Sequence, residues 1–184
     1  MIPDKVILGI DPGTRILGWG VIKVSCGKAE YLSMGVIDMR KLTDHYLKLK
    51  KILEEVSKLI KLYKPAELAI EAPFYGKNVQ SMLVLGRAQG AAISAALLAD
   101  LPIFEYAPKK VKMAITGKGG ASKEQVASLL LNILKIKDSP DFLDATDGVA
   151  VAYCHFIDSS NPISGNNFAG GWKEFIRQHP ELVK

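Results

Sequence analysis

The chain has 184 residues, of which 48% are hydrophobic and 23% charged, and its formal net charge is +5. These values exclude a wholly disordered chain, and the length suits one folded domain with a tail better than several domains. The positive charge is compatible with a polyanionic partner, but it is spread along the chain without a run of five like charges.

The sequence gives no sign of export or membrane insertion. It has neither an apolar signal segment nor the run of about 18 apolar residues that a membrane helix needs. Cys26 and Cys154 are far apart and show no pairing pattern, which predicts two free, buried thiols in a reducing compartment. We therefore expect a cytoplasmic protein with no membrane partner.

The first third of the chain predicts three antiparallel strands, at residues 6–10, 16–24 and 31–39. Residues 6–10 form a short apolar run that ends at Asp11, and Pro12 and Gly13 then turn the chain. Short connections favour a meander of hairpins. Asp11 is thus expected at a strand tip, where it is either a turn residue or part of a functional site.

The rest of the chain alternates helices and strands. The expected elements are a helix at 43–63, a strand at 67–71, a helix at 78–99, a strand at 102–106, a helix at 122–135 and a helix at 139–156. Helix caps are predicted at Thr43, Asn78, Ser122 and Ser139, and Gln125 completes a capping box with Ser122. This order predicts an α/β protein with a mixed five-stranded sheet flanked by helices.

We expect residues 1–158 to form one domain and residues 159–184 to form a C-terminal tail. The tail opens with a linker rich in Ser, Asn, Pro and Gly. Trp172, Phe175 and Ile176 could then line one face of a short helix. This spacing indicates a docked or mobile segment more than a catalytic one. The helix of residues 78–99 is rich in small residues, which suits either core packing or a dimer interface.

Four acidic residues are candidates for one catalytic site. Glu71, like Asp11, ends an apolar strand, so the two carboxylates emerge side by side if the strands are parallel neighbours. Asp144 and Asp147 share one face of the last helix, although acids near a helix start also have a structural explanation. Convergent carboxylates repel one another unless hard divalent cations bind, and two such cations promote phosphodiester cleavage. No Cys/His cluster suits zinc, so Mg²⁺ or Mn²⁺ is the expected metal.

Two further stretches are candidates for nucleic-acid contact. Phe74, Tyr75 and Lys77 follow Glu71 in a loop, where an aromatic ring could stack on an unpaired base or simply belong to the core. A basic stretch comes later and contains Lys109, Lys110, Lys112, Lys118 and Lys123, interrupted by glycines at 117, 119 and 120. A flexible glycine loop between lysines could follow a phosphate backbone, and a solvated charged surface is the alternative.

Three separated motifs resemble the RuvC family of crossover (Holliday) junction endonucleases. They are Gly9-Ile10-Asp11-Pro12-Gly13-Thr14 with Gly18, Ile70-Glu71 with Phe74 and Lys77-Asn78, and Leu143-Asp144-Ala145-Thr146-Asp147-Gly148. Residues 85–90 and 105–112 also resemble family stretches. The resemblance covers about residues 5–158, and the motifs stand in the family's order.

The resemblance implies a ribonuclease H-like fold and a homodimer that binds a four-way DNA junction in recombination and repair. It implies paired, symmetric nicks by Mg²⁺-dependent hydrolysis, with Mn²⁺ as a substitute, leaving 5′-phosphate and 3′-hydroxyl ends. Asp11, Glu71, Asp144 and Asp147 match the metal-binding catalytic acids. Phe74 matches an aromatic that stacks at the crossover, and Lys112 and Lys123 match residues that contact DNA or support catalysis. The branch-migration proteins RuvA and RuvB are the implied partners.

Three alternatives remain open at this point. Sugar-kinase and actin-like ATPases also use Gly-Ile-Asp-x-Gly-Thr, but they need two domains around a nucleotide cleft, and the last two acids have no role in them. A ribonuclease H-like enzyme acting on RNA or an RNA–DNA hybrid would share the chemistry. A protein that binds branched DNA without cutting it would not need four acids.

Overall fold

The computed structural model describes residues 4–73, 78–136 and 143–160. Its strands are β1 (Lys5–Asp11), β2 (Ile16–Ser25), β3 (Lys28–Asp38), β4 (Glu67–Glu71) and β5 (Ile103–Tyr106). Its helices are α1 (His45–Tyr63), α2 (Val79–Leu97), α3 (Pro108–Thr116), α4 (Lys123–Ile133) and α5 (Leu143–Ser160).

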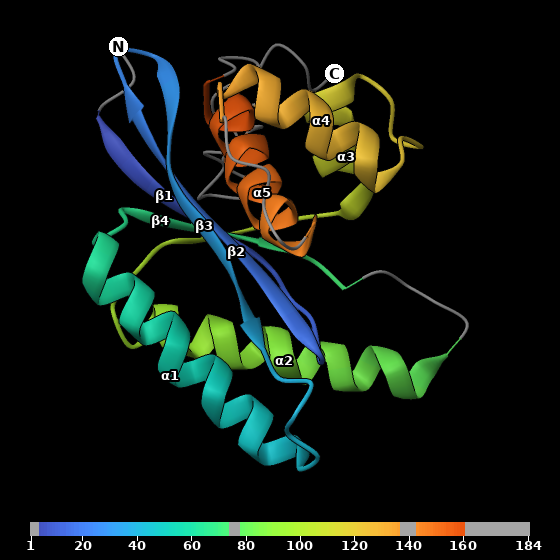
Figure 1. Cartoon of the computed structure of the whole chain (residues 1–184). Helices are drawn as coiled ribbons and strands as arrows, with labels where there is room; N and C mark the ends of the chain where they lie inside the picture. The colour runs from blue at the N-terminus through green and yellow to red at the C-terminus, as the bar shows by residue number, and fades with distance from the viewer. Residues whose placement is uncertain (1–3, 74–77, 137–142, 161–184) are drawn as a thin grey trace, which may run out of the picture.

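The five strands form one mixed sheet in the order β3-β2-β1-β4-β5. β1, β2 and β3 are an antiparallel meander, as the short connections predicted. β4 runs parallel to β1, with Ile10 opposite Ile70, and β5 runs parallel to β4. Helices α1 and α2 cover one face of the sheet, and α3, α4 and α5 cover the other (Figure 1). The predicted mixed five-stranded sheet flanked by helices is confirmed.

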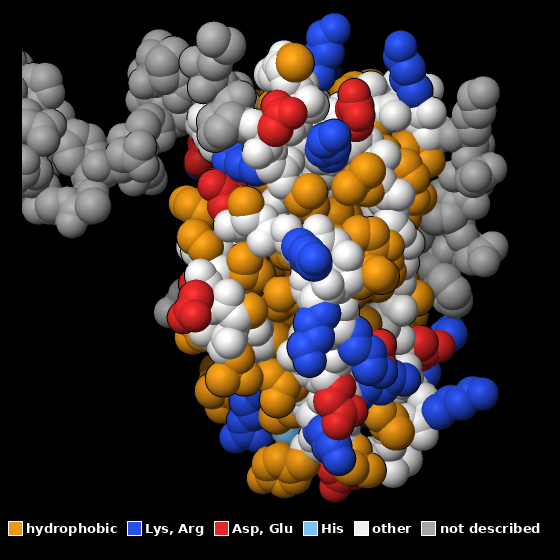
Figure 2. All heavy atoms as spheres, turned by 90° about the vertical axis from the view of Figure 1, so that its left-hand side faces the viewer, with side chains coloured by type: hydrophobic (Ala, Val, Ile, Leu, Met, Phe, Trp, Pro, Cys, Tyr) orange, Lys and Arg blue, Asp and Glu red, His pale blue; other side chains and the backbone are white. Residues whose placement is uncertain are grey.

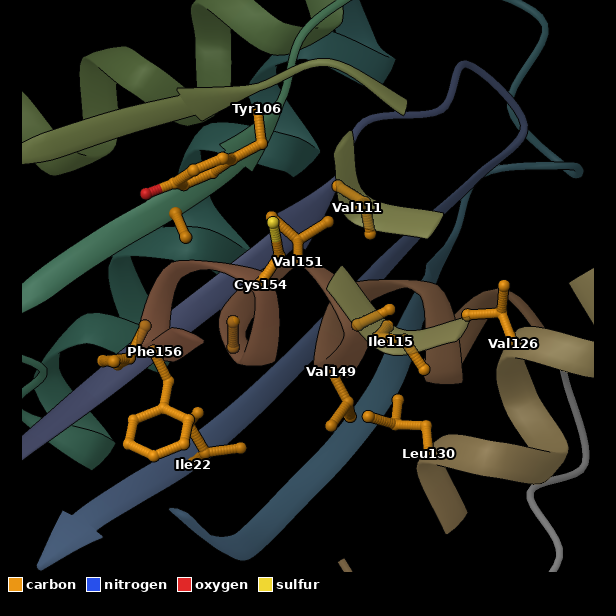
Figure 3. Packing of buried hydrophobic residues seen from close by; sticks show 14 of the residues in the cluster. Ile22, Tyr106, Val111, Ile115, Val126, Leu130, Val149, Val151, Cys154 and Phe156 are labelled. Atoms are coloured by element: carbon orange, nitrogen blue, oxygen red, sulfur yellow. The ribbon is translucent and has the colours of Figure 1, made fainter. Parts of the chain in front are cut away.

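Alternation along the strands decides which side chains face which helix layer. On β1, Leu8 and Ile10 belong to the core beneath α1 and α2, whereas Ile7 belongs to the core beneath α5. Since side chains of a strand alternate between the two faces, Asp11 points to the same side as Ile7. Around α5, the side chains of Val149, Val151 and Cys154 pack among residues of the sheet, α3 and α4 (Figure 3).

The observed starts of α2 and α4 agree with the caps predicted from the sequence. Asn78 caps α2, and Ser122 and Gln125 form a capping box at α4. The first cap was predicted one residue too early: α1 begins at His45, and the carboxylate of Asp44 accepts from the Leu47 amide at 2.8 Å. Thr43 lies just before this cap. The predicted start at Ser139 lies outside the described residues, and α5 continues to Ser160, beyond the predicted end at 156.

Helix α3 was missed, and its three lysines were interpreted as part of a basic loop. Proline stands at its first helical position, and its only buried side chains are Val111 and Ile115, one turn apart. Two apolar residues among lysines give too short a pattern to indicate a helix in the sequence. Lys109, Lys110 and Lys112 are therefore helical, Lys118 follows in the loop, and Lys123 begins α4. The prediction of a buried Cys26 was also wrong, because this residue is exposed in the β2–β3 turn, whereas Cys154 is buried.

Figure 2 shows hydrophobic side chains interspersed mostly with Lys and Arg on one face of the molecule. The positive charge is thus distributed over this face, just as it is spread along the sequence, and it is not gathered in one block. Among the described residues, no helix combines the length and the apolar character needed to cross a bilayer.

Candidate active site

Two of the four acids lie at neighbouring strand tips. Asp11 is the last residue of β1 and Glu71 the last of β4, and the two strands are parallel neighbours in the sheet. Ile7 on β1 and Ala69 on β4 pack in the core that includes α5. Asp11 follows Ile7 by four residues and Glu71 follows Ala69 by two, so both acidic side chains lie on this same face of the sheet. The predicted side-by-side emergence of these carboxylates is confirmed.

Helix α5 brings the other two acids to Asp11 because it lies directly on the backbone of the sheet. Gly18 is paired with Asp11 across β1 and β2, and a Cβ added to Gly18 would stand 1.8 Å from the carbonyl oxygen of Asp144. A Cβ added to Gly148 would stand 2.4 Å from the Cα of Trp19. Only glycine permits so close an approach. The small residues at these crossings thus set the distance between the acids of α5 and the tip of β1.

Asp11, Glu71 and Asp147 line one hollow of about 220 Å³. Its other walls come from α3, α4 and α5, and they are Pro108, Val111, Lys112, Lys123, Val126 and Ala150. Asp144 is not among the lining residues. It lies one turn before Asp147 on α5, and its side chain is 37% exposed against 16% for Asp147. Asp144 therefore stands at the margin of the site.

Lys123 is the counter-ion of this group of acids. Its Nζ lies 2.6 Å from Asp147 Oδ2 and 3.7 Å from Asp144 Oδ1. Burial lowers the pKa of this ammonium, but the hydrogen bond and charge of Asp147, with the charges of Asp11 and Asp144, outweigh burial and raise it. Lys123 therefore stays positively charged beside the acids.

The acids are held in an environment that disfavours their charge. Burial, followed by repulsion from Glu71 and Asp147, raises the pKa of Asp11 to about 8. Burial and the charge of Asp147 raise the pKa of Glu71 to about 7, against the attraction of Lys123 and Lys112. The pKa of Asp147 is also raised, mainly by burial. The hollow thus lacks positive charge even with two lysines beside it.

The chemistry of these residues suits a hard divalent cation, but their present spacing does not. Carboxylate oxygens are the ligands that Mg²⁺ takes in proteins, and a cation would offset the burial and the repulsion that raise these pKa values. Over the described ranges, however, no three His, Cys, Asp or Glu side chains stand close enough to hold one ion between them. Binding a metal would require the side chains around Lys123 to move closer together.

The comparisons with known proteins agree with this geometry. The family model for the crossover junction endodeoxyribonuclease RuvC matches residues 7–155. A RuvC endonuclease of Bacteroides fragilis is 57% identical to the chain over an alignment that covers 100% of this chain and 98% of the relative. This chain belongs to the RuvC family. It is accordingly a nuclease of the crossover junction endodeoxyribonuclease class.

Solved RuvC structures share the fold. The RuvC of Thermus thermophilus is 31% identical, with a TM-score of 0.75, and the match covers 84% of this chain and 95% of that one. A second Thermus thermophilus RuvC structure, in complex with Holliday junction substrate, matches with a TM-score of 0.74 at 29% identity over 84% of this chain and 94% of that one. The ribonuclease H-like fold that the resemblance implied is confirmed, and the ATPase alternative is removed.

The structure divides the predicted DNA-contact residues of this chain into four groups. Phe74 and Lys77 lie outside the described residues. Lys112 Nζ donates to the carbonyl of Ala121 at 2.8 Å, and Lys110 Nζ lies 2.8 Å from Asp158 Oδ1, so both have partners within the fold. Lys109 and Lys118 are exposed, and Lys123 is bound to the acids.

Gln89 is a site-supporting residue that sequence reasoning did not single out. It is 8% exposed on the buried face of α2, and its Nε2 donates to Glu105 Oε2 at 2.9 Å and to the backbone carbonyl of Glu71 at 3.4 Å. It thus holds the end of β4 from the side opposite the hollow. A long polar side chain among the small buried residues of α2 was the available signal.

His155 lies on the same helix as the acids but outside the hollow. Its Nε2 donates to Glu67 Oε2 at 2.8 Å, and its Nδ1 is 2.6 Å from the hydroxyl of Tyr106. The ring of Phe104 stacks on it with a centroid distance of 4.3 Å. These contacts agree with a structural role, as the sequence favoured.

Proposed function

We propose that this protein resolves four-way DNA junctions in recombination and repair by hydrolysing one phosphodiester in each of two opposed strands. The products would carry 5′-phosphate and 3′-hydroxyl ends. The observation that carries the proposal is the meeting of Asp11, Glu71 and Asp147 in one hollow, with Asp144 at its margin. In a member of the RuvC family, this carboxylate group is the part of the fold suited to phosphodiester chemistry.

We assign Asp11, Glu71, Asp144 and Asp147 as the catalytic acids and as the ligands of Mg²⁺, two ions per site, with Mn²⁺ as a substitute. All four donors are carboxylates. The raised pKa values of Asp11 and Glu71 mean that their charged forms are disfavoured, and a bound cation would stabilise them. When bound, such ions supply the charge that lowers the pKa of an attacking water and stabilises the leaving oxygen.

The protein's own residues hold the reacting groups in place. Asp11, the most buried of the acids, is fixed at the end of β1 and defines the floor of the site. Lys123 keeps Asp147 oriented by a 2.6 Å contact and adds positive charge where a scissile phosphate would lie. The apolar walls formed by Val111, Val126 and Ala150 limit the access of water to the buried side of the hollow.

We propose that DNA is held through Lys109, Lys110, Lys112, Lys118 and Lys123, together with Phe74 and Lys77, which lie outside the described residues. Lys109 and Lys118 are the ones most available to phosphates. Lys112 supports the loop at Ala121, which places the start of α4 and so Lys123. Lys110 would reach phosphate only by exchanging its contact with Asp158.

The assembly completes this proposal. Two opposed nicks require two active sites, so we propose a homodimer, acting with RuvA and RuvB in the cytoplasm. We assign residues 1–158 to the nuclease domain and 159–184 to a tail; α5 extends two residues past that boundary, to Ser160.

The deciding experiment offers the purified protein a labelled four-way junction, a linear duplex and an RNA–DNA hybrid, each with Mg²⁺ or EDTA. We expect symmetric cutting of the junction that requires Mg²⁺. Asp11→Asn should abolish cutting while junction binding persists, and Asp100→Asn, in the loop after α2, is the matched control. Preferential cutting of the hybrid would support the ribonuclease alternative and contradict the proposal.

A further inference from the structure

A second hollow, which we call the groove, lies near the C-terminal ends of α4 and α5, whereas the acids lie near the N-terminal ends of these helices. It has a volume of about 680 Å³ and shares no lining residue with the active-site hollow. Its apolar walls are Tyr31 from β3, Ile133 and Leu134 from the end of α4, and Tyr153 and Phe156 from α5.

The groove leaves apolar surface in contact with water. Ile133 is 43% exposed although it is a large aliphatic side chain, and Tyr31 and Tyr153 are only partly buried. The rings of Tyr153 and Phe156 are 5.7 Å apart and tilted by 50°, so the wall they form is aromatic. Burying apolar surface gains about 25 cal/mol per Å², which makes a cover for this groove favourable.

The chain itself supplies a segment of matching chemistry that begins beside the groove. Helix α5 ends at Ser160, whose Oγ donates to the carbonyl of Phe156, one turn earlier. Beyond it, Trp172, Phe175 and Ile176 have the spacing of one helix face. Residues 161–171 could span about 35 Å when extended, so they allow these side chains to reach any part of the groove.

We propose that Trp172, Phe175 and Ile176 of the C-terminal tail bind in the groove of their own chain and cover the ends of α4 and α5. The Bacteroides fragilis match includes this tail because it covers the whole chain, whereas the Thermus thermophilus match covers 84% of it. The tail therefore lies within the part of the chain that aligns with the Bacteroides fragilis relative.

The first test measures trypsin cleavage of the native full-length protein at Lys173, between Trp172 and Phe175, and at Arg177, directly after Ile176. Ile133→Glu should accelerate cleavage at these two sites about ten-fold, because cleavage follows the population of the undocked tail. Leu129→Glu is the matched control: it lies one turn earlier on α4, is 42% exposed and does not line the groove.

Phe175→Glu changes the tail and leaves the domain untouched, and it should give the same acceleration. Thermal unfolding of each variant excludes general loss of the fold. Cleavage at the wild-type rate in both Ile133→Glu and Phe175→Glu would overturn the proposal.

The second test uses Cys26, which is exposed and adjoins the groove residue Gly27. A short bis-maleimide should link it to the thiol introduced by Glu174→Cys within one chain, and Cys26→Ser should abolish the link. Links found only between chains would assign the groove to the tail of a second copy and would refute docking within the chain.

Discussion

The close packing of α5 on the sheet predicts that Gly18→Ala impairs catalysis, although this substitution removes no catalytic group. A Cβ at this position would stand 1.8 Å from the Asp144 carbonyl oxygen, and real Cβ contacts are essentially never below 3.0 Å. The start of α5 must therefore retreat from β2 by at least about 1.2 Å, the difference between these two distances. The two nearest atoms, the carbonyl oxygen and carbonyl carbon of Asp144, belong to the backbone, so a side-chain rotation cannot relieve the clash.

This retreat separates the acids of α5 from Asp11 without removing any of them. A displacement of about 1 Å at a reacting centre costs roughly 10²-fold in rate. Overpacking should also cost about 1–3 kcal/mol of stability. We expect the single-turnover rate of junction cutting to fall about 10²-fold while junction affinity changes little.

The assay is single-turnover cutting of a labelled junction in saturating Mg²⁺, with thermal unfolding of the same samples. Gly90→Ala is the matched control, because no heavy atom lies within 4 Å of a Cβ there and alanine favours a helix by about 0.4–1 kcal/mol. Combining the two substitutions offsets part of the stability loss. A folded Gly18→Ala protein that cuts at the wild-type rate would refute the proposed role of this contact.

Three further predictions concern charge. In EDTA, the raised pKa of Asp11, about 8, means that the folded state binds more protons than the unfolded state above pH 4, so stability should fall as the pH rises toward 8. Melting curves of Asp11→Asn should fall less steeply over that window, and parallel curves would contradict the assignment. Hydrogen bonding from His155, acting against burial and assisted by Lys5, lowers the pKa of Glu67 to about 2. Glu67→Gln should therefore lower the melting temperature at pH 7, and its difference from the wild type should shrink as the pH falls from 4.5 toward 2; a constant difference would count against this ion pair. Lys118→Ala should reduce the slope of log affinity for junction DNA against log salt by about 1, whereas Lys50→Ala, an exposed lysine on the opposite helix layer, should leave the slope unchanged.

Sequence patterns predicted the fold well where local signals were strong. The run of apolar residues before Asp11, the amphipathic period of α1 and the caps of α2 and α4 each determine an element through interactions within a few residues. Helix α3 was missed because two buried side chains give too weak a period, and its lysines suggested a loop. The first cap shifted from Thr43 to Asp44 because both residues are acceptable caps and only the position of the first turn decides between them.

The sequence by itself determined which residues could form the site. Two strand-end acids and a helical pair of acids are local features, and the family motifs connected them. Their assembly was decided by the tertiary structure, because it depends on parallel pairing of β1 with β4 and on the close approach of α5 at Gly18 and Gly148. The same packing placed Asp144 at the margin and Lys123 against Asp147. Contacts between residues more than a hundred positions apart, such as Gly18 with Asp144, leave no periodic signal in a single sequence, so only the folded chain shows them.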